Sequence, residues 1–385
     1  MNKLLSAIST YALWVVVPLG CLAKSKFEHQ SENASLSTEI PGKQGKSAEA
    51  QEHADNKHIA KKKGSSSKKK TSAYRETVPT PTLSNIPYGA HNKQVLDFWK
   101  APSASADKLA PLVYYIHGGA WQHGSKEKNI NGCIDVAALV KAGVSVVAIE
   151  YRFVKEAIAD GIDPPVKAPL SDAARALQFV RSKAKEWHID KERIAAAGGS
   201  AGGCSSLWLA YHDDMADPSS DDTVARESTR LFGAAVRVPQ STLDPQQIND
   251  WLKGVPYGGH AFGVSNKNFL NERERLLPWI KEYSPYAHVT ADDPPVVMYY
   301  ASRFKDKLDA HSPQYGFHLA KRCKQLGLFC EVRGLENTPM ENVSELTDYL
   351  IKRLKAKVAT GKRATQMKRE RNQLFNQAIK ESPYD

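Results

Sequence analysis

One short stretch of the chain, Arg193–Gly203, places a serine at the tip of a turn flanked by glycines. Gly198, Ser200 and Gly202 fit the Gly-x-Ser-x-Gly pattern, in which a strand turns sharply into a helix and exposes the serine hydroxyl. The glycines are needed because a side chain two residues from the serine would collide with the strand or the helix. Apolar residues before the turn predict the strand, and a helix is expected over residues 201–212. This pattern is typical of a nucleophilic serine.

A second motif, His-Gly-Gly-Ala-Trp at His117–Trp121, lies about 80 residues earlier and follows the apolar run 112–116, which predicts a buried strand. Consecutive glycines leave backbone N–H groups uncovered, so that these groups can face the negative charge of a tetrahedral intermediate. In an ester hydrolase they act together with the N–H of the residue after the nucleophile. The candidate oxyanion-hole donors are therefore the amides of Gly118, Gly119 and Ala201.

With these two motifs the chain resembles the α/β-hydrolase family, in particular its esterase/lipase branch with an HGG oxyanion motif. It is similar to hormone-sensitive-lipase-like and feruloyl-esterase-like carboxylesterases over residues 87–354. The resemblance implies an α/β-hydrolase fold, with a mostly parallel central sheet flanked by helices. It also implies a carboxylic-ester hydrolase that forms an acyl-enzyme at Ser200 and needs no cofactor or metal. The expected substrate is a small-molecule or polysaccharide-linked ester.

The family order of catalytic residues is serine, then an acid, then histidine. The acid belongs after the strand predicted at 296–301, where Asp306 and Asp309 are both candidates. Asp309 is preferred because it stands just before the helix start at His311. Either carboxylate could instead cap a helix or be solvated.

The histidine is the point at which the sequence departs from the family. The loop expected after the last strand, residues 335–344, has no histidine, and none follows His318. Three explanations remain open: a relocated base, for which His311 is the best-placed residue; a serine that acts with the oxyanion hole alone; or a catalytically inactive hydrolase fold that binds a ligand. If the rest of the site is intact, a histidine introduced at Asn342 or Val343 should restore the family arrangement.

Strands and helices alternate through the body of the chain, 86–357, and this alternation favours a mostly parallel sheet with crossover helices. The expected strands are 95–99, 112–116, 144–151, 193–198, 232–238, 296–301 and 329–333, and the expected helices are 133–142, 170–187, 201–212, 313–326 and 347–357. The segment 239–290, rich in Pro, Gly and aromatic residues, interrupts the alternation. It is expected either to form a lid over the carboxyl ends of the strands or to be a satellite apolar cluster under a long loop.

Residues 1–23 are typical of an export signal, with a lysine followed by an apolar stretch and small residues. Cleavage after Ala23 would release a soluble periplasmic or secreted protein, whereas cleavage before Cys21 would leave a lipid anchor. In neither case would the mature form have a transmembrane span. Among the remaining cysteines, Cys323 and Cys330 could pair in an exported protein or remain buried thiols.

The net charge of +11 and the pI of about 9.2 come from the two ends of the chain. Residues 1–85 carry +6 and residues 352–385 carry +7, which leaves −2 on the body and argues against nucleic-acid binding. Residues 24–85 form a Ser/Lys-rich segment with too little apolar surface to fold. This segment is a solvated spacer or a contact to an anionic cell envelope, and residues 358–385 are expected to form a basic helical tail.

Overall fold

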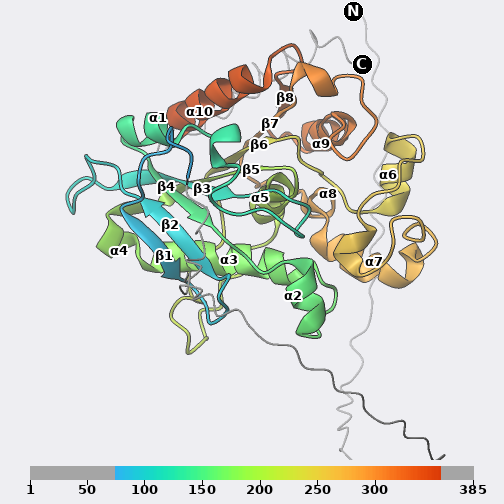
Figure 1. The fold of residues 1–385 in the computed structure, drawn as a ribbon, viewed down its shortest axis with the longest axis horizontal. Coiled ribbons are helices and arrows are strands. Elements are labelled where there is room, and N and C mark those ends of the chain that lie inside the picture. The colour runs from blue at the N-terminus through green and yellow to red at the C-terminus, as the bar shows by residue number, and fades with distance from the viewer. Residues whose placement is uncertain (1–73, 357–385) are drawn as a thin grey trace, which may run out of the picture. The chain divides into compact units, whose positions relative to one another are not determined.

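The computed structural model describes residues 74–356 and contains an eight-stranded sheet in the order β1-β2-β4-β3-β5-β6-β7-β8 (Figure 1). The strands are β1 (Leu83–Pro87), β2 (Val95–Trp99), β3 (Ala110–Ile116), β4 (Ser145–Ile149), β5 (Ile189–Gly199), β6 (Gly233–Arg237), β7 (Val296–Tyr299) and β8 (Cys330–Arg333). The strands β1, β2 and β4 pair antiparallel, and every pairing from β4 through β3 to β8 is parallel. The mostly parallel sheet predicted from the sequence is confirmed.

Helices follow each strand from β3 to β8 and cover both faces of the sheet (Figure 1). They are α1 (Val136–Lys141), α2 (Val154–Ala159), α3 (Lys167–Ser182), α4 (Ala184–Trp187), α5 (Ala201–Tyr211), α6 (Pro245–Trp251), α7 (Arg273–Tyr283), α8 (Pro285–His288), α9 (Gln314–Gln325) and α10 (Pro339–Lys355), with short 3-10 turns at Ile130–Gly132, Gly259–Phe262 and Ser302–Phe304. The single helix expected over 170–187 is divided at Lys183 into α3 and α4.

Two apolar cores lie on the two faces of the sheet. One contains residues of α3 and α5, such as Leu177 and Leu207, and the other contains residues of α1 and α10, such as Leu139 and Leu350. Every residue of β3 and β4 is buried, as a strand covered on both faces requires. The sheet is therefore held rigidly between helices, and its carboxyl edge can position side chains accurately.

The packed body begins before residue 86, where the sequence placed its start. The hydroxyl of Tyr74 donates to Asp97 at 2.6 Å, and the indole N–H of Trp99 donates to the carbonyl of Pro79 at 2.7 Å. Residues 74–85 therefore belong to the body and include most of β1, because they satisfy polar groups on β2. The predicted signal at 1–23, the rest of the spacer and the tail at 358–385 lie outside the described residues and remain predictions.

The segment 239–290 is a helical insertion containing α6, α7 and α8 and not a long loop. Its own apolar residues, among them Phe262, Phe269 and Leu276, are buried in the larger core. A cavity of about 460 Å³ lies between this insertion and α9, and Ser200 is not among the residues that line it. The position of the insertion over the serine therefore remains a prediction.

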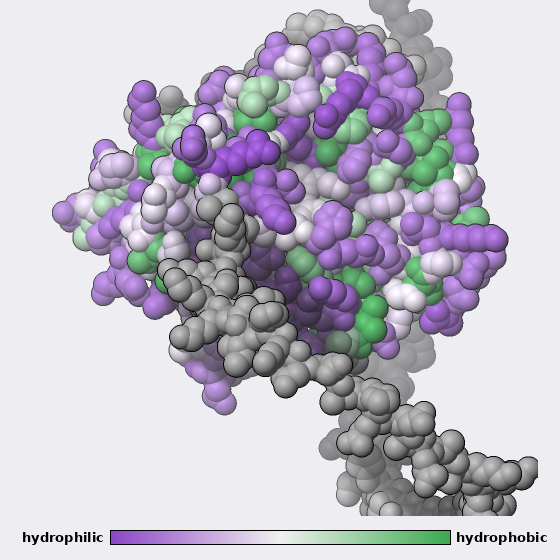
Figure 2. Space-filling view, viewed as in Figure 1, coloured by the Kyte–Doolittle hydropathy of each residue, from purple (hydrophilic) through white to green (hydrophobic). Residues whose placement is uncertain are grey.

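The surface drawn in Figure 2 is mainly polar, with apolar side chains in small separate patches. The large apolar side chains that are exposed in the described part of the chain are Leu83, Leu109, Ile158, Leu270, Leu308 and Met340. Among residues 74–356, no helix combines the length and the apolarity needed to cross a bilayer.

Candidate active site

Ser200 lies at the turn between β5 and α5, in the middle of the sheet. Its backbone has φ 53° and ψ −124°, a left-handed conformation that is strained for a residue with a side chain. The turn is held from the neighbouring strand, because the amide of Ser200 donates to the carbonyl of Arg237 at 2.9 Å. The residue remains half-buried, whereas all of α5 behind it is buried. This strained turn directs one hydroxyl away from the core at the carboxyl edge of the sheet.

The glycines around the serine are required by close backbone contacts. A Cβ atom at Gly202 would overlap the carbonyl oxygen of Ile116 and lie 2.6 Å from that of His117. A Cβ atom at Gly198 would lie 2.7 Å from the same Ile116 oxygen. Real Cβ atoms do not come this close to a carbonyl oxygen. With any residue other than glycine at these positions, β3 and α5 could not pack this closely. The steric reason given for the glycines from the sequence therefore agrees with the structure.

His311 is the imidazole that the structure brings to Ser200. Its Nε2 atom lies 3.0 Å from the Oγ atom of Ser200, although the two residues are 111 positions apart in the chain. His311 belongs to the loop between β7 and α9, in which the carbonyl of Ala310 accepts a hydrogen bond from the side chain of Gln240. Phe304 lies beside the imidazole, with 5.7 Å between the ring centroids. A serine within hydrogen-bond distance of an imidazole is the arrangement that activates a nucleophile.

The two candidate acids are placed differently. A carboxylate oxygen of Asp309 accepts the backbone N–H of His311 at 2.8 Å and so shapes the loop that carries the imidazole. Among the described residues, no hydrogen bond joins an acid to the Nδ1 atom of His311. Asp306 is exposed. The structure therefore favours Asp309 as the acid that acts on His311, through the backbone and through its charge.

Burial lowers the pKa of His311 below the ordinary value for histidine. The charge of Asp309 acts in the opposite direction and raises the pKa, while the cations Arg303 and Lys307 lower it. The net effect favours the neutral ring, and only a neutral ring can accept a proton from Ser200. His311 is therefore suited to act as a base at neutral pH.

Because the pKa of His311 is lowered, we expect kcat/KM for an ester to stay on its plateau at neutral pH. Activity should fall only as the pH drops below about 6.5, the ordinary histidine value, since protonation then removes the base. Asp309→Asn should shift the midpoint of this fall in kcat/KM to lower pH, because the carboxylate raises the pKa of His311. Arg303→Gln should shift the midpoint to higher pH, because Arg303 lowers the pKa of His311. Measured pH–rate profiles with a midpoint above 7, or with no shift in Asp309→Asn, would contradict the assignment.

The predicted oxyanion loop lies against the serine turn. A Cβ atom added to Gly118 would lie 2.5 Å from the carbonyl oxygen of Gly199 and 3.5 Å from the Cβ atom of Ser200. The loop then turns tightly: Gly119 has φ +121°, and its carbonyl accepts the amides of residues 122 and 123. Ala201, the third predicted donor, is the first residue of α5. The structure brings Gly118 to the serine, and convergence of the three amides on one point remains a prediction.

His117 supports this loop from behind and does not contact the serine hydroxyl. It is fully buried, its Nδ1 atom lies 2.7 Å from the carbonyl oxygen of Gly118, and its Nε2 atom lies 3.3 Å from a carboxylate oxygen of Glu150. The ring stacks on Tyr151 with 4.2 Å between the centroids, and the Tyr151 hydroxyl donates to the His117 carbonyl at 2.8 Å. Sequence reasoning did not find Glu150 or Tyr151, whose only signal was their position directly after the buried strand β4.

The prediction of a loop over residues 335–344, after β8, was wrong. Residues 335–344 do not form one loop, because α10 begins at Pro339, eight residues before the helix start expected at 347. Asn342 and Val343 are therefore buried in the first turns of α10, and the Nδ2 atom of Asn342 lies 3.4 Å from the carbonyl oxygen of Gly334. An imidazole at Asn342 would have to displace Gly334. We therefore no longer expect a histidine at either position to supply the base.

A mostly parallel α/β sheet with a strained serine turn and a histidine beside the hydroxyl is the arrangement typical of the α/β-hydrolase class. The chain belongs to the BD-FAE family, an α/β-hydrolase esterase family, whose model matches residues 96–308. The match includes Gly118 and Ser200 and ends three residues before His311. The family resemblance noted from the sequence is thereby confirmed.

Known proteins similar to this chain include two from Mycobacterium tuberculosis. The chain is 33% identical over 230 residues to the probable carboxylic ester hydrolase LipM, covering 58% of this chain and 47% of that protein. It is 26% identical over 223 residues to the esterase LipC, covering 56% of this chain and 49% of that protein. The chain thus spans about half the length of these curated relatives.

Solved structures with the same fold include a truncated carbohydrate esterase from gut microbiota. It has a TM-score of 0.57 at 17% identity and covers 74% of this chain and 100% of that chain. Esterase 2 of the planctomycete Thermogutta terrifontis has a TM-score of 0.51 at 21% identity, covering 69% of this chain and 90% of that chain. At these identities the likeness shows the fold and nothing finer.

Proposed function

We propose that this protein hydrolyses carboxylic esters, with Ser200 as the nucleophile and His311 as a base relocated from the loop after β8. The observation that carries the proposal is the 3.0 Å contact between Ser200 Oγ and His311 Nε2. Membership of an esterase family and similarity to proteins named as ester hydrolases support the reaction class.

The proposed reaction begins when His311 Nε2 accepts the proton of the Ser200 hydroxyl and Oγ attacks the ester carbonyl carbon. The resulting oxyanion lies toward the amides of Gly118, Gly119 and Ala201, which stabilise its charge. The alcohol then leaves with the proton that His311 returns, and an acyl-enzyme remains at Ser200. Water, deprotonated by His311, releases the acid and restores the serine.

We expect the turnover to be modest because, within residues 74–356, no carboxylate is hydrogen-bonded to the Nδ1 atom of His311. In a complete triad the acid holds the imidazole in the tautomer that can accept the serine proton. In this protein Asp309 holds the backbone of His311, so that only its charge favours the imidazolium. A positioned general base typically accelerates a reaction by about 10²–10⁴-fold. We expect His311 to provide only part of that acceleration.

The experiment that tests this function is hydrolysis of a series of p-nitrophenyl esters, from acetate to octanoate, by the purified full chain. We expect release of p-nitrophenol above the buffer rate, with saturation as the ester concentration rises. If the protein instead bound an unreactive ester analogue without hydrolysing any ester in the series, it would be a ligand-binding hydrolase fold. That result would refute the proposed activity.

A further inference from the structure

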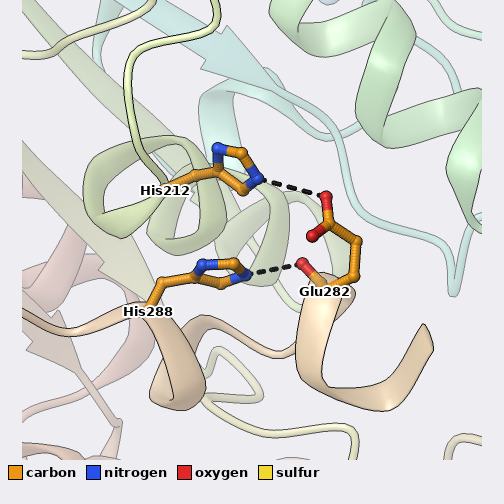
Figure 3. Close-up of side chains that lie close together, drawn as sticks. All are labelled: His212, Glu282 and His288. Atoms are coloured by element: carbon orange, nitrogen blue, oxygen red, sulfur yellow. Dashed lines mark hydrogen bonds and ion pairs between the residues drawn. The ribbon is translucent and has the colours of Figure 1, made fainter. Parts of the chain in front are cut away.

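A second group of reactive side chains lies at the far end of α5 from Ser200. Ser200 is the N-cap of α5 and His212 is its C-cap, about 18 Å away along the helix. There His212 meets Glu282 of α7 and His288 at the end of α8 (Figure 3). One nitrogen of each histidine and one carboxylate oxygen of Glu282 all lie within 4.8 Å of one another. The group is separate from the proposed catalytic residues.

The contact between His212 and Glu282 is one that a cation would stabilise. The Nδ1 atom of His212 lies 2.9 Å from the carbonyl oxygen of Asp213, and a carbonyl can only accept, so Nδ1 carries the hydrogen. The Nε2 atom faces a carboxylate oxygen of Glu282 at 3.1 Å (Figure 3). In a neutral ring that nitrogen has only a lone pair, which would face the charged oxygen. A metal ion between the two atoms would remove this unfavourable contact, as a proton would.

His288 adds a second imidazole to the same place. Its ring centroid lies 4.6 Å from that of His212, and its Nε2 atom donates to the backbone carbonyl of Glu282 at 2.6 Å (Figure 3). A neutral imidazole always has one nitrogen with a free lone pair. In the contact with the Glu282 carbonyl that nitrogen is Nδ1, so His288 becomes a ligand of the same ion when the hydrogen moves to Nδ1 and Nε2 turns from the carbonyl toward the ion.

We propose that His212, Glu282 and His288 form a zinc-binding site that fastens the helical insertion to the helix carrying Ser200. Zn²⁺ binds to sets of two imidazoles and one carboxylate, whereas Mg²⁺ and Ca²⁺ prefer sets made of oxygen ligands alone. The side chain of Glu282 is 48% exposed, so that solvent can reach the group and supply a fourth ligand.

The surroundings of the three ligands also suit a metal ion. Histidines that bind metals almost always donate their other N–H group to a carbonyl or carboxylate, as His212 does to Asp213. The end of α7 is held in place by Trp208, whose indole N–H donates to the carbonyl of Glu282 at 2.8 Å. A bound ion would thus join α5, α7 and α8, because each contributes one ligand or sits directly beside one.

The test uses the full chain after dialysis against a chelator. We expect CoCl₂ to give the visible absorption of tetrahedral cobalt, and ZnCl₂ to displace it with one equivalent per site. At about 100 times its dissociation constant, Zn²⁺ should raise the melting temperature by about 5 °C. MgCl₂ at the same concentration should give no cobalt displacement and no shift.

Glu282→Gln and His212→Ala should each remove the cobalt spectrum and the zinc-dependent shift. Glu274→Gln, which changes an exposed carboxylate on the same helix α7, is the matched control and should bind like the wild type. Glu282→Gln keeps the size of the side chain and should fold, so that its metal binding can be measured even if His212→Ala is unstable. Zinc binding of wild-type strength in Glu282→Gln, or no zinc-dependent shift in the wild type, would overturn the proposal.

Discussion

Ser200→Ala should reduce kcat/KM for p-nitrophenyl acetate by about 10³-fold or more. The substitution removes the only atom that can form the acyl-enzyme while leaving the backbone amides around the site in place. Those amides and substrate binding can still accelerate hydrolysis over water by about 10³–10⁴-fold, so a small residual rate is expected. Initial rates at several ester concentrations, corrected for the buffer reaction, give the ratio.

Ser206→Ala is the matched control for this substitution. Ser206 lies on the same helix, and its hydroxyl donates to the carbonyl of Gly202 at 2.8 Å. Because that hydroxyl is buried, its removal should cost stability but leave kcat/KM within about twofold. If Ser200→Ala retained the activity of the wild type, Ser200 would not be the nucleophile.

His311→Ala should reduce kcat/KM about as much as Ser200→Ala does. The reason is that Ser200 at its ordinary pKa is a poor nucleophile, and His311 is the imidazole in contact with it. Added imidazole in the buffer should restore part of the activity, since the missing group leaves space beside the serine. A purely structural role for His311 would not give this rescue.

The control for His311 is His318→Ala, a change on the neighbouring helix α9. His318 lies in α9 and stacks on Trp251, with 4.2 Å between the ring centroids. We expect this substitution to lower stability and to leave the pH–rate profile unchanged. Full activity in His311→Ala would mean that a different base serves Ser200.

The sequence predicted the sheet, the serine turn and the glycine loop because each depends on local chemistry. The turn fixes the spacing of the glycines at 198 and 202, and the carbonyl oxygen of Ile116 lies too close to allow a Cβ atom at either position. The contact between His311 and Ser200 does not depend on local sequence. It depends on the path of a loop 111 residues further along the chain, and no spacing rule gives that path.

The start of α10 was missed although the sequence contained a signal for it. Thr338 and Glu341 form a capping box: the Thr338 hydroxyl accepts from the amide of Glu341 at 3.3 Å, and the Glu341 carboxylate accepts from the amide of Thr338 at 2.6 Å. Pro339 stands at the first helical position, which favours a helix start. This local capping pattern marks the start of α10 at Pro339, within the region where the family resemblance implies a loop.

The zinc-binding site proposed at the end of α5 had no linear signal. His212 and Glu282 are 70 residues apart, and His288 follows six residues after Glu282 on a different helix. Metal motifs in a sequence are recognised when several ligands share one helix or one loop. In this protein each ligand comes from a different helix end, so only the packing of the insertion on α5 brings them together.

The most direct test of the paired action of Ser200 and His311 is a double-mutant cycle. We would measure kcat/KM for p-nitrophenyl acetate in the wild type, Ser200→Ala, His311→Ala and the double mutant. Residues of one catalytic unit are grossly non-additive, so the double mutant should be no slower than the slower of the two single mutants. Losses that multiply in the double mutant would show that the two residues act independently and would contradict the mechanism.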